Sequence, residues 1–433
     1  MPYDIIIGRD DSDKKRFGER GLVYLGKGYI KMGNYTSLSN RILLDVARSH
    51  VILIAGKRGS GKSYSLGAIA EELANLQGEE RESIGSLIFD TMGIFWTMKY
   101  KNEKEKELLN EWNLKTKNLP CKVFVPLGYA SVYEEKGIPV DKPFALKVNE
   151  VGIEDWLITF NLPLIDPVAV LIERVLGSLE GEYDIDDILL ELGKINASED
   201  IKEAARSLFY AVKTWGIFGK KGEKSTAITD LITPGTTSIL DLSPYNAVGV
   251  FNIRALVIGL ICRKLFHERM QSRKKEEVES VHQGADYLAF KHDREIPLIW
   301  LFIDEVHEFI GKGEKTAATD ALIQLLREGR QPGISLVMAT QQPGALHPDA
   351  LTQSDIVISH RVTAKPDLEG LNEMMQSYLL DSIKHYLDDL PHLKGSAIIL
   401  DDNSERIYPV RIRPRFTWHG GESPTSVKIE KRI

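Results

Sequence analysis

The segment "GKRGSGKS" at residues 56–63 has the residue types and the spacing to hold a phosphate group. Its glycines let backbone N–H groups turn toward phosphate oxygens, Lys62 can reach the β- and γ-phosphates, and the hydroxyl of Ser63 can bind Mg²⁺. A run typical of a buried strand, "HVILIAG", precedes the segment, and a helical pattern follows from Lys62 to Leu76. A glycine-rich turn without a ligand is the alternative, but the strand and the helix favour a site for ATP.

The predicted nucleotide-binding residues are continuous in the sequence. They are Gly56, Lys57, Arg58, Gly59, Ser60, Gly61, Lys62, Ser63 and Tyr64. Lys62 is also a predicted catalytic residue, because its charge would stabilise the phosphoryl group during transfer.

A second motif, "LIWLFIDEVHEF" at 298–309, supplies the carboxylates that hydrolysis needs. Six apolar residues predict a buried strand, and two acids follow it directly. We expect Asp304 to bind Mg²⁺ together with Ser63, and Glu305 to act as the base that orients water. Two adjacent acids could instead cap a helix, but the phosphate-binding motif in the same chain favours hydrolysis.

Composition limits the possible partners and the compartment. The net charge of -7 does not suit a surface that is cationic throughout, so any contact with DNA would be local. Cys121 and Cys262 lack the spacing of a zinc site, which favours a reduced, cytoplasmic protein. Because no window offers 18 uninterrupted apolar residues, we expect neither a signal peptide nor a membrane span.

The elements that must position these motifs predict an α/β fold. Apolar runs at 86–90, 121–126, 237–243 and 334–339 alternate with helical patterns, which indicates a mostly parallel sheet covered on both faces. Lys62 and Asp304 are separated by more than half of the chain, a gap that fits a RecA-like core of a P-loop NTPase. A transporter-type ATPase would need an LSGGQ-like signature in that gap, and the sequence contains none.

Changes in pattern divide the chain into four predicted parts. Short strands predict a small β segment over 1–45. The core begins at 46–150 and resumes at 236–433, where it ends in a tail. Between them, 3.6-residue periodicity over 167–179, 185–192 and 201–215 predicts a helical insertion at 151–235.

Taken together, these motifs resemble a known family. The segments "HVILIAGKRGSGKS", "LIFDTMG", "TSILDLS", "LFIDEVHEFI", "LREGRQPGISLVMATQQP" and "VRIRPRFTWHGG" are similar, in this order, to the HerA branch of the HerA/FtsK superfamily. The resemblance covers roughly residues 45–420. It implies a homo-hexameric ATPase that translocates double-stranded DNA through a central channel, often with a nuclease partner.

The resemblance also implies roles for residues near the strand at 334–339. Gln341 matches the polar residue that senses the γ-phosphate from the end of that strand. Arg330, in a "GRxxG" pattern, matches the arginine that such motors offer to the nucleotide of the adjacent subunit. Arg327 and Arg361 are lesser candidates for this role, and each arginine could instead form a surface salt bridge.

The sequence departs from the family pattern in two places. HerA proteins usually begin with a longer β-barrel than the 45 residues here allow, and Lys57 and Arg58 stand where the branch often has small or neutral residues. Contacts with DNA are open: "GKKGEKS" at 219–225 and the basic run 273–275 (Arg273, Lys274, Lys275) could face a channel or be solvated surface.

The leading hypothesis is therefore a ring-shaped ATPase that translocates or unwinds double-stranded DNA in end processing, repair or defence. One alternative keeps the ATPase but couples it to conjugation or secretion. Another is a regulatory ring that binds ATP and controls a partner effector without moving DNA.

Overall fold

The computed structural model describes residues 3–32, 35–247, 251–284, 294–375, 383–422 and 426. Within these residues the strands form one sheet in the order β1-β3-β2-β13-β12-β11-β4-β10-β9-β5-β8-β6-β7. In that spatial order their bounds are β1 Ile5–Ile7, β3 Tyr35–Asp45, β2 Leu22–Met32, β13 Arg406–Ile412, β12 Ser396–Asp401, β11 Ile356–Ser359, β4 Val51–Ala55, β10 Ile334–Thr340, β9 Leu298–Ile303, β5 Ile84–Asp90, β8 Thr237–Asp241, β6 Cys121–Pro126 and β7 Lys142–Phe144.

The centre of the sheet is parallel, as the sequence predicts. Every neighbouring pair from β11 through β4, β10, β9, β5, β8 and β6 to β7 runs in parallel, whereas β12, β13 and β2 pair antiparallel. All residues of β5, β8 and β10 are buried, because helices cover both faces of a parallel sheet. The predicted α/β fold with a mostly parallel sheet is confirmed.

Alternate residues of the central strands enter two separate hydrophobic cores. On β4, Ile52 and Ile54 belong to the core that contains helix α2 (Lys62–Ala74), while Leu53 and Ala55 belong to the other core. The second core includes α11 (Ile253–Gln283) and α12 (Thr319–Glu328). This division follows from the two-residue period of a strand, which sends successive side chains to opposite faces.

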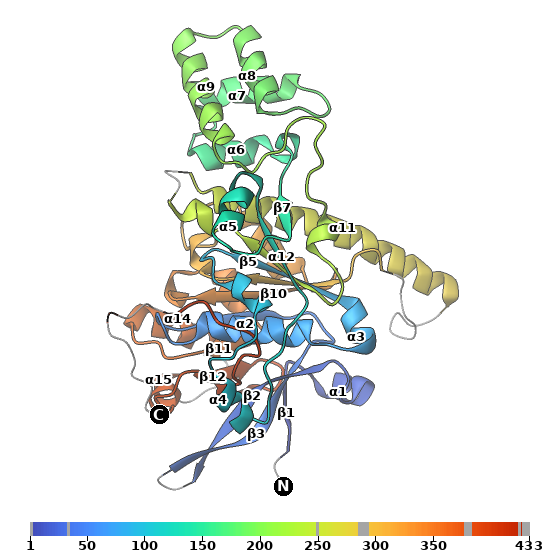
Figure 1. The fold of residues 1–433 in the computed structure, drawn as a ribbon, viewed down its shortest axis with the longest axis vertical. Coiled ribbons are helices and arrows are strands. Elements are labelled where there is room, and N and C mark those ends of the chain that lie inside the picture. The colour runs from blue at the N-terminus through green and yellow to red at the C-terminus, as the bar shows by residue number, and fades with distance from the viewer. Residues whose placement is uncertain are drawn as a thin grey trace.

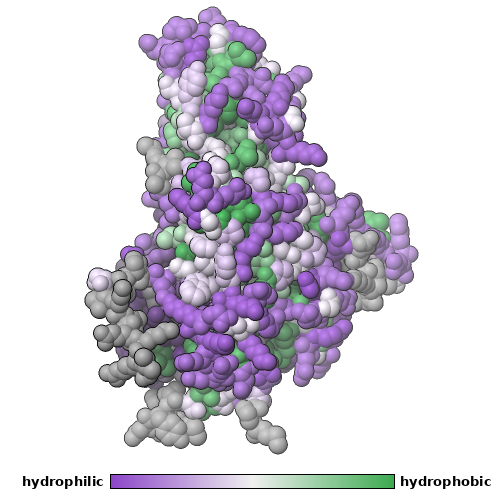
Figure 2. Space-filling view, in the orientation of Figure 1, coloured by the Kyte–Doolittle hydropathy of each residue, from purple (hydrophilic) through white to green (hydrophobic). Residues whose placement is uncertain are grey.

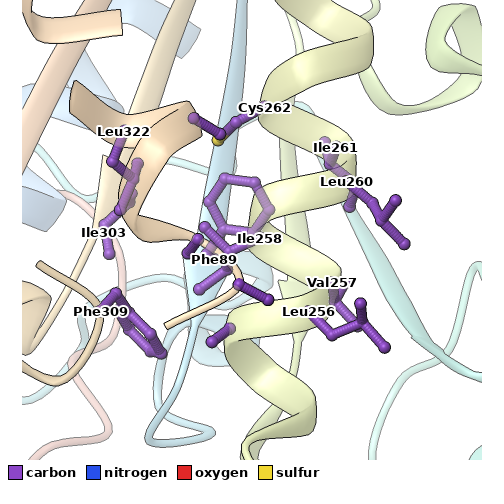
Figure 3. Packing of buried hydrophobic residues seen from close by; sticks show 14 of the residues in the cluster. Phe89, Leu256, Val257, Ile258, Leu260, Ile261, Cys262, Ile303, Phe309 and Leu322 are labelled. Carbon is purple, nitrogen blue, oxygen red and sulfur yellow. The ribbon is translucent and has the colours of Figure 1, made fainter. Parts of the chain in front are cut away.

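Figure 3 shows the packing of α11 in the second core. Ile258 and Cys262 lie on the side of the helix that faces Phe89 and Leu322, and all four side chains are buried. Burial of apolar surface on each of the Ile, Phe and Leu side chains stabilises the fold by about 1.5–3 kcal/mol. The helix continues through the basic run 273–275 to Gln283, and residues 285–293 lie outside the described part of the chain.

The predicted helical insertion consists of α6 to α10, and Figure 1 shows α7, α8 and α9 standing beyond the sheet. Their bounds are α6 Ile153–Phe160, α7 Pro167–Ser178, α8 Ile185–Lys194, α9 Glu199–Lys213 and α10 Ile228–Leu231. Trp156 anchors the unit, because its ring stacks on Phe160 at 5.4 Å and meets Phe209 edge-on at 5.5 Å. Hydrophobic residues reach the surface here (Figure 2), and Ile165 is 89% exposed.

The N-terminal strands extend the main sheet. β2 and β3 form a long antiparallel hairpin, and β2 pairs with β13, so that β1 becomes an edge strand of the sheet. Among residues 3–32 and 35–45 the strands therefore do not close into a barrel of their own. Helix α1 (Asp11–Phe17) lies between β1 and β2, where the sequence analysis predicted no helix.

Shorter helices complete the described structure: α3 Gly78–Ser83, α4 Lys106–Glu111, α5 Ala130–Glu135, α13 Pro348–Thr352, α14 Lys365–Met375 and α15 Ile383–Asp388. None of the helices within the described ranges is both long and apolar enough to cross a membrane.

Candidate nucleotide-binding and hydrolysis site

The strand order brings the predicted site together at one edge of the sheet. β10 lies between β4 and β9, with Thr340 opposite Ala55 and Met338 opposite Ile303. Because all three strands are parallel, the segments that follow them meet at the same edge. The phosphate-binding loop after β4, Gln341 after β10 and the acids after β9 are therefore neighbours in space.

The phosphate-binding loop depends on glycine at two positions. Gly61 caps α2 with φ 113°, a left-handed conformation that L side chains rarely adopt. At Gly56, a β-carbon would lie 2.4 Å from Ser60 Oγ, so the loop could not close in this way. Two backbone hydrogen bonds hold the start of the loop to the segments that end the neighbouring strands. Gly56 N donates to Thr340 O at 3.3 Å, and Lys57 N donates to Arg361 O at 3.0 Å.

Ser63 and Asp304, the two predicted metal ligands, are in direct contact. The hydroxyl of Ser63 donates a hydrogen bond of 2.5 Å to Asp304 Oδ2. A hydroxyl beside a carboxylate is the oxygen donor set that suits Mg²⁺, which retains several water ligands in such sites. The residues present therefore fit the predicted ion, and no group of three or more His, Cys, Asp or Glu within the described ranges forms a metal cluster elsewhere.

Burial sets the protonation of the charged groups around this contact. It raises the pKa of Asp304, and the charge of Glu305 adds to that rise while Ser63 and Lys62 oppose it. Burial lowers the pKa of Lys62, which is only 5% exposed. The negative charges of Glu305 and Asp304 oppose this effect, because they favour the charged amine. A bound cation would favour the ionised form of Asp304, and an anionic phosphate would favour charged Lys62.

Glu305 has a backbone conformation that is rare for a residue other than glycine. Its φ is 51°, a left-handed value that costs about 1–3 kcal/mol in a non-glycine residue. Glu305 Oε1 accepts a hydrogen bond from Gln341 Nε2, and Oε2 is buried without a hydrogen-bond partner. One carboxylate oxygen is thus held by the amide while the other remains available to a water molecule, as a base requires.

His307 lies beside this pair and was missed by the sequence analysis. Its Nδ1 is 3.6 Å from Glu305 Oε2 and 3.2 Å from Thr340 Oγ1. The only signal in the sequence is its position three residues after Asp304 in "DEVHEF". That position alone does not distinguish His307 from the other polar residues of the turn.

Tyr64 belongs to the predicted nucleotide-binding set, but its side chain has other partners. The phenol donates to Glu105 Oε2 and accepts from the backbone N–H of Arg415, both at 2.7 Å. Its ring also meets His419 edge-on at 5.3 Å. The backbone of Tyr64, in the first turn of α2, is the part left to bind a phosphate. Lys57 and Arg58 are exposed on the outer side of the loop.

Arg330 lies at the opposite end of β10 from Gln341. It is exposed in the turn between α12 and β10, and a strand of seven residues spans about 23 Å. Arg330 therefore cannot reach the phosphate loop of its own chain. Arg327 forms an ion pair of 2.6 Å with Asp349, and the backbone of Arg361 lies beside its own phosphate loop.

Two further acids lie at the same edge of the sheet as Asp304 and Glu305. Asp90 ends β5 beside β9, and Asp241 ends β8 as its register partner. Burial, reinforced by Asp241, raises the pKa of Asp90 to about 8. Asp90 also accepts the backbone N–H groups of Gly93 at 2.8 Å and Phe95 at 2.7 Å, so it shapes the turn after β5.

The basic segments that were open as DNA contacts carry ion pairs. Lys221 Nζ lies 3.2 Å from Asp187 Oδ2 on α8, within the helical insertion. Arg273 on α11 pairs with Glu277 at 2.5 Å. These ion pairs are what the alternative, a solvated surface, would show. A contact of either segment with DNA stays a prediction.

Fold and site together define a P-loop NTPase in which a glutamate, Glu305, follows the strand of the second motif. No family model matches the chain. The DNA double-strand break repair helicase HerA of Pyrococcus furiosus is 26% identical over 222 residues, 47% of this chain and 38% of that protein. The protein of the same name from Saccharolobus solfataricus is 22% identical over 393 residues, 87% of this chain and 67% of that protein.

A probable HerA helicase of Methanocaldococcus jannaschii is 25% identical over 183 residues, 38% of this chain and 36% of that protein. VirB4 of Thermoanaerobacter pseudethanolicus shares the fold, with a TM-score of 0.51, 12% identity and coverage of 92% of this chain and 97% of that one. The match thus spans well under half of the length of the Pyrococcus and Methanocaldococcus relatives. These relatives confirm the resemblance to the HerA branch of the HerA/FtsK superfamily.

Proposed function

We propose that this chain hydrolyses ATP with Mg²⁺ and uses the energy to translocate or unwind double-stranded DNA, in end processing, repair or defence. The observation that carries the hydrolysis is the pair of contacts at the sheet edge, Ser63 with Asp304 and Gln341 with Glu305. The relatives named as DNA double-strand break repair helicases support the DNA substrate.

Each residue of the site has a separate role in the proposed reaction. Backbone N–H groups of the loop and Lys62 bind the β- and γ-phosphates, while Ser63 and Asp304 hold the ion. Mg²⁺, when bound, neutralises charge on the β- and γ-oxygens. Glu305 accepts a proton from water as the water oxygen attacks the γ-phosphorus. The bond from that phosphorus to the β–γ bridging oxygen breaks, and ADP and phosphate result. Gln341 holds the carboxylate in place for this step.

Assembly into a homo-hexamer would complete the site. Arg330 is exposed at the edge of the sheet opposite its own phosphate loop, where the loop of an adjacent subunit could meet it. A guanidinium at that boundary would stabilise charge on the transferred phosphoryl group, so hydrolysis would depend on the ring. A nuclease or another effector protein would be the partner that uses the translocated DNA.

Steady-state ATPase rates with linear duplex DNA of increasing length test this function. We expect the rate to rise with DNA and to depend on its length, because a motor that reaches an end must rebind. The Glu305→Gln variant serves as the background control. A rate indifferent to DNA of any length would exclude translocation and favour the regulatory ring or a motor for another substrate. The mass of the particle in solution, with and without nucleotide, tests the ring.

A further inference from the structure

His360 lies under the phosphate-binding loop and has no role in the chemistry described so far. It follows β11 directly, and its side chain is fully buried, with 0% exposure. Its Nδ1 is 3.0 Å from the backbone oxygen of Ser396 on β12, and its Nε2 is 2.8 Å from Ser65 Oγ in the first turn of α2. The ring thus bridges the neighbouring strand and the helix that begins at the loop.

These two contacts determine the tautomer of the ring. A carbonyl oxygen can only accept a hydrogen bond, so Nδ1 must carry the proton and donate it to Ser396 O. The bare Nε2 then accepts the hydroxyl hydrogen of Ser65. A doubly protonated ring could not accept this hydrogen. Burial, and after it the charge of Lys62, lower the pKa of His360 to about 4 against the opposing effect of Ser396 O, so the ring is neutral at physiological pH.

The loop lies directly against His360. A β-carbon on Gly56 would come within 2.8 Å of His360 Cβ, and one on Gly61 within 3.6 Å of Cε1. Backbone hydrogen bonds bind the same segments, since His360 N donates to Ala55 O at 2.8 Å. The position of this ring therefore sets the height of the loop and of the first turn of α2 above the sheet.

We propose that His360 is a positioning residue for phosphate binding, which holds the loop and α2 in the binding geometry through Ser65 on one side and Ser396 on the other. This inference rests on the proposed binding of ATP. The ring touches no reacting atom, so it acts on the ground state and the transition state alike. Its loss should weaken nucleotide binding without slowing turnover at saturation.

A set of variants tests the inference by the affinity for Mg²⁺–ATPγS and by the steady-state constants for ATP. His360→Leu removes both hydrogen bonds, and we expect the Kd and the KM to rise about tenfold while kcat changes less than about threefold. His360→Gln can donate to Ser396 O and accept from Ser65, and should restore most of the affinity. His50→Gln is the matched control, because His50 is also a buried, doubly bonded histidine but lies at the other edge of the sheet.

Two measurements keep the inference falsifiable if His360→Leu does not fold. Ser65→Ala removes only the hydroxyl, and we expect a higher Kd here as well. In the wild-type protein, ¹⁵N imidazole spectra should show a protonated Nδ1 and a bare Nε2 throughout about pH 6 to 8. Unchanged affinity in both His360→Leu and Ser65→Ala, or a protonated Nε2, would overturn the inference. If the wild-type protein itself binds no ATPγS, the proposed function fails instead.

Discussion

Ser63 on α2 and Asp304 after β9 are joined by a hydrogen bond of 2.5 Å although their strands, β4 and β9, are not neighbours. β10 lies between these strands and ends in Thr340, and Gln341, the next residue, reaches Glu305. The nucleotide's phosphates would therefore meet three strand ends at once. Any displacement of β10 would move the amide that holds the carboxylate of Glu305, the proposed base.

Glu305→Gln should abolish turnover while ATP still binds. The amide cannot accept a proton from water, and losing a positioned base typically costs about 10²–10⁴ in rate. Single-turnover hydrolysis and the Kd for ATPγS, measured on the same preparation, separate the two effects. Residual turnover close to that of the wild type would show that Glu305 is not the base.

Arg330→Ala should remove hydrolysis and leave nucleotide binding intact, because an arginine offered across a subunit boundary contributes about 10³–10⁵ to kcat. Mixing this variant with Lys62→Ala gives a sharper test. In mixed rings an intact arginine of one subunit can serve the intact loop of the next, so activity should reappear. Arg327→Ala is the matched control, since that arginine pairs with Asp349. Full activity of Arg330→Ala alone would contradict action between subunits.

Glu71→Leu should destabilise the protein strongly. Glu71 on α2 is fully buried and accepts hydrogen bonds from Arg413 Nη1 and Arg415 Nε at 3.0 Å and from two backbone N–H groups of the C-terminal segment. Burial would raise the pKa of Glu71, but the two arginines outweigh this effect and lower it. Removing one partner of such a cluster leaves buried charge, which costs about 3–5 kcal/mol. Denaturant unfolding measures the loss.

Glu80→Leu, at a partly exposed position in the first turn of α3, controls for the substitution itself. A loss of stability at Glu71 no larger than at Glu80 would mean that the C-terminal segment is not held to α2 by this cluster.

Stability should fall at alkaline pH because of His50. Burial would lower the pKa of this histidine, but Asp355 and Asp45 outweigh it and raise the pKa to about 9. A raised pKa means that the folded state holds the proton more tightly than the unfolded chain. The raised pKa of His50 contributes about 3 kcal/mol to the free energy of unfolding. This contribution is fully present below about pH 6.5 and is lost as the pH rises through about 9.

The free energy of unfolding, measured from pH 6 to about 10, tests this dependence. His50→Gln should show a flatter profile over the same range, since glutamine does not titrate. Equal slopes for the two proteins would assign the pH dependence to other groups.

The sequence by itself determined the parts of this protein that depend on consecutive residues. A phosphate loop is built from adjacent backbone N–H groups, so Gly56 to Ser63 could be recognised without a fold. Apolar runs of strand length and 3.6-residue periodicity located the central strands and the helices of the insertion, because burial of one face imposes the pattern. Asp304 and Glu305 were predicted since they directly follow such a run.

Only the tertiary structure decided which segments meet. The sequence does not encode the strand order in any local pattern, because crossovers between parallel strands allow several orders. The contact of Ser63 with Asp304 and the bridge of His360 between Ser65 and Ser396 both follow from that order. The N-terminal strands joined the main sheet for the same reason: an edge such as β13 offers unpaired backbone groups, and β2 satisfies them.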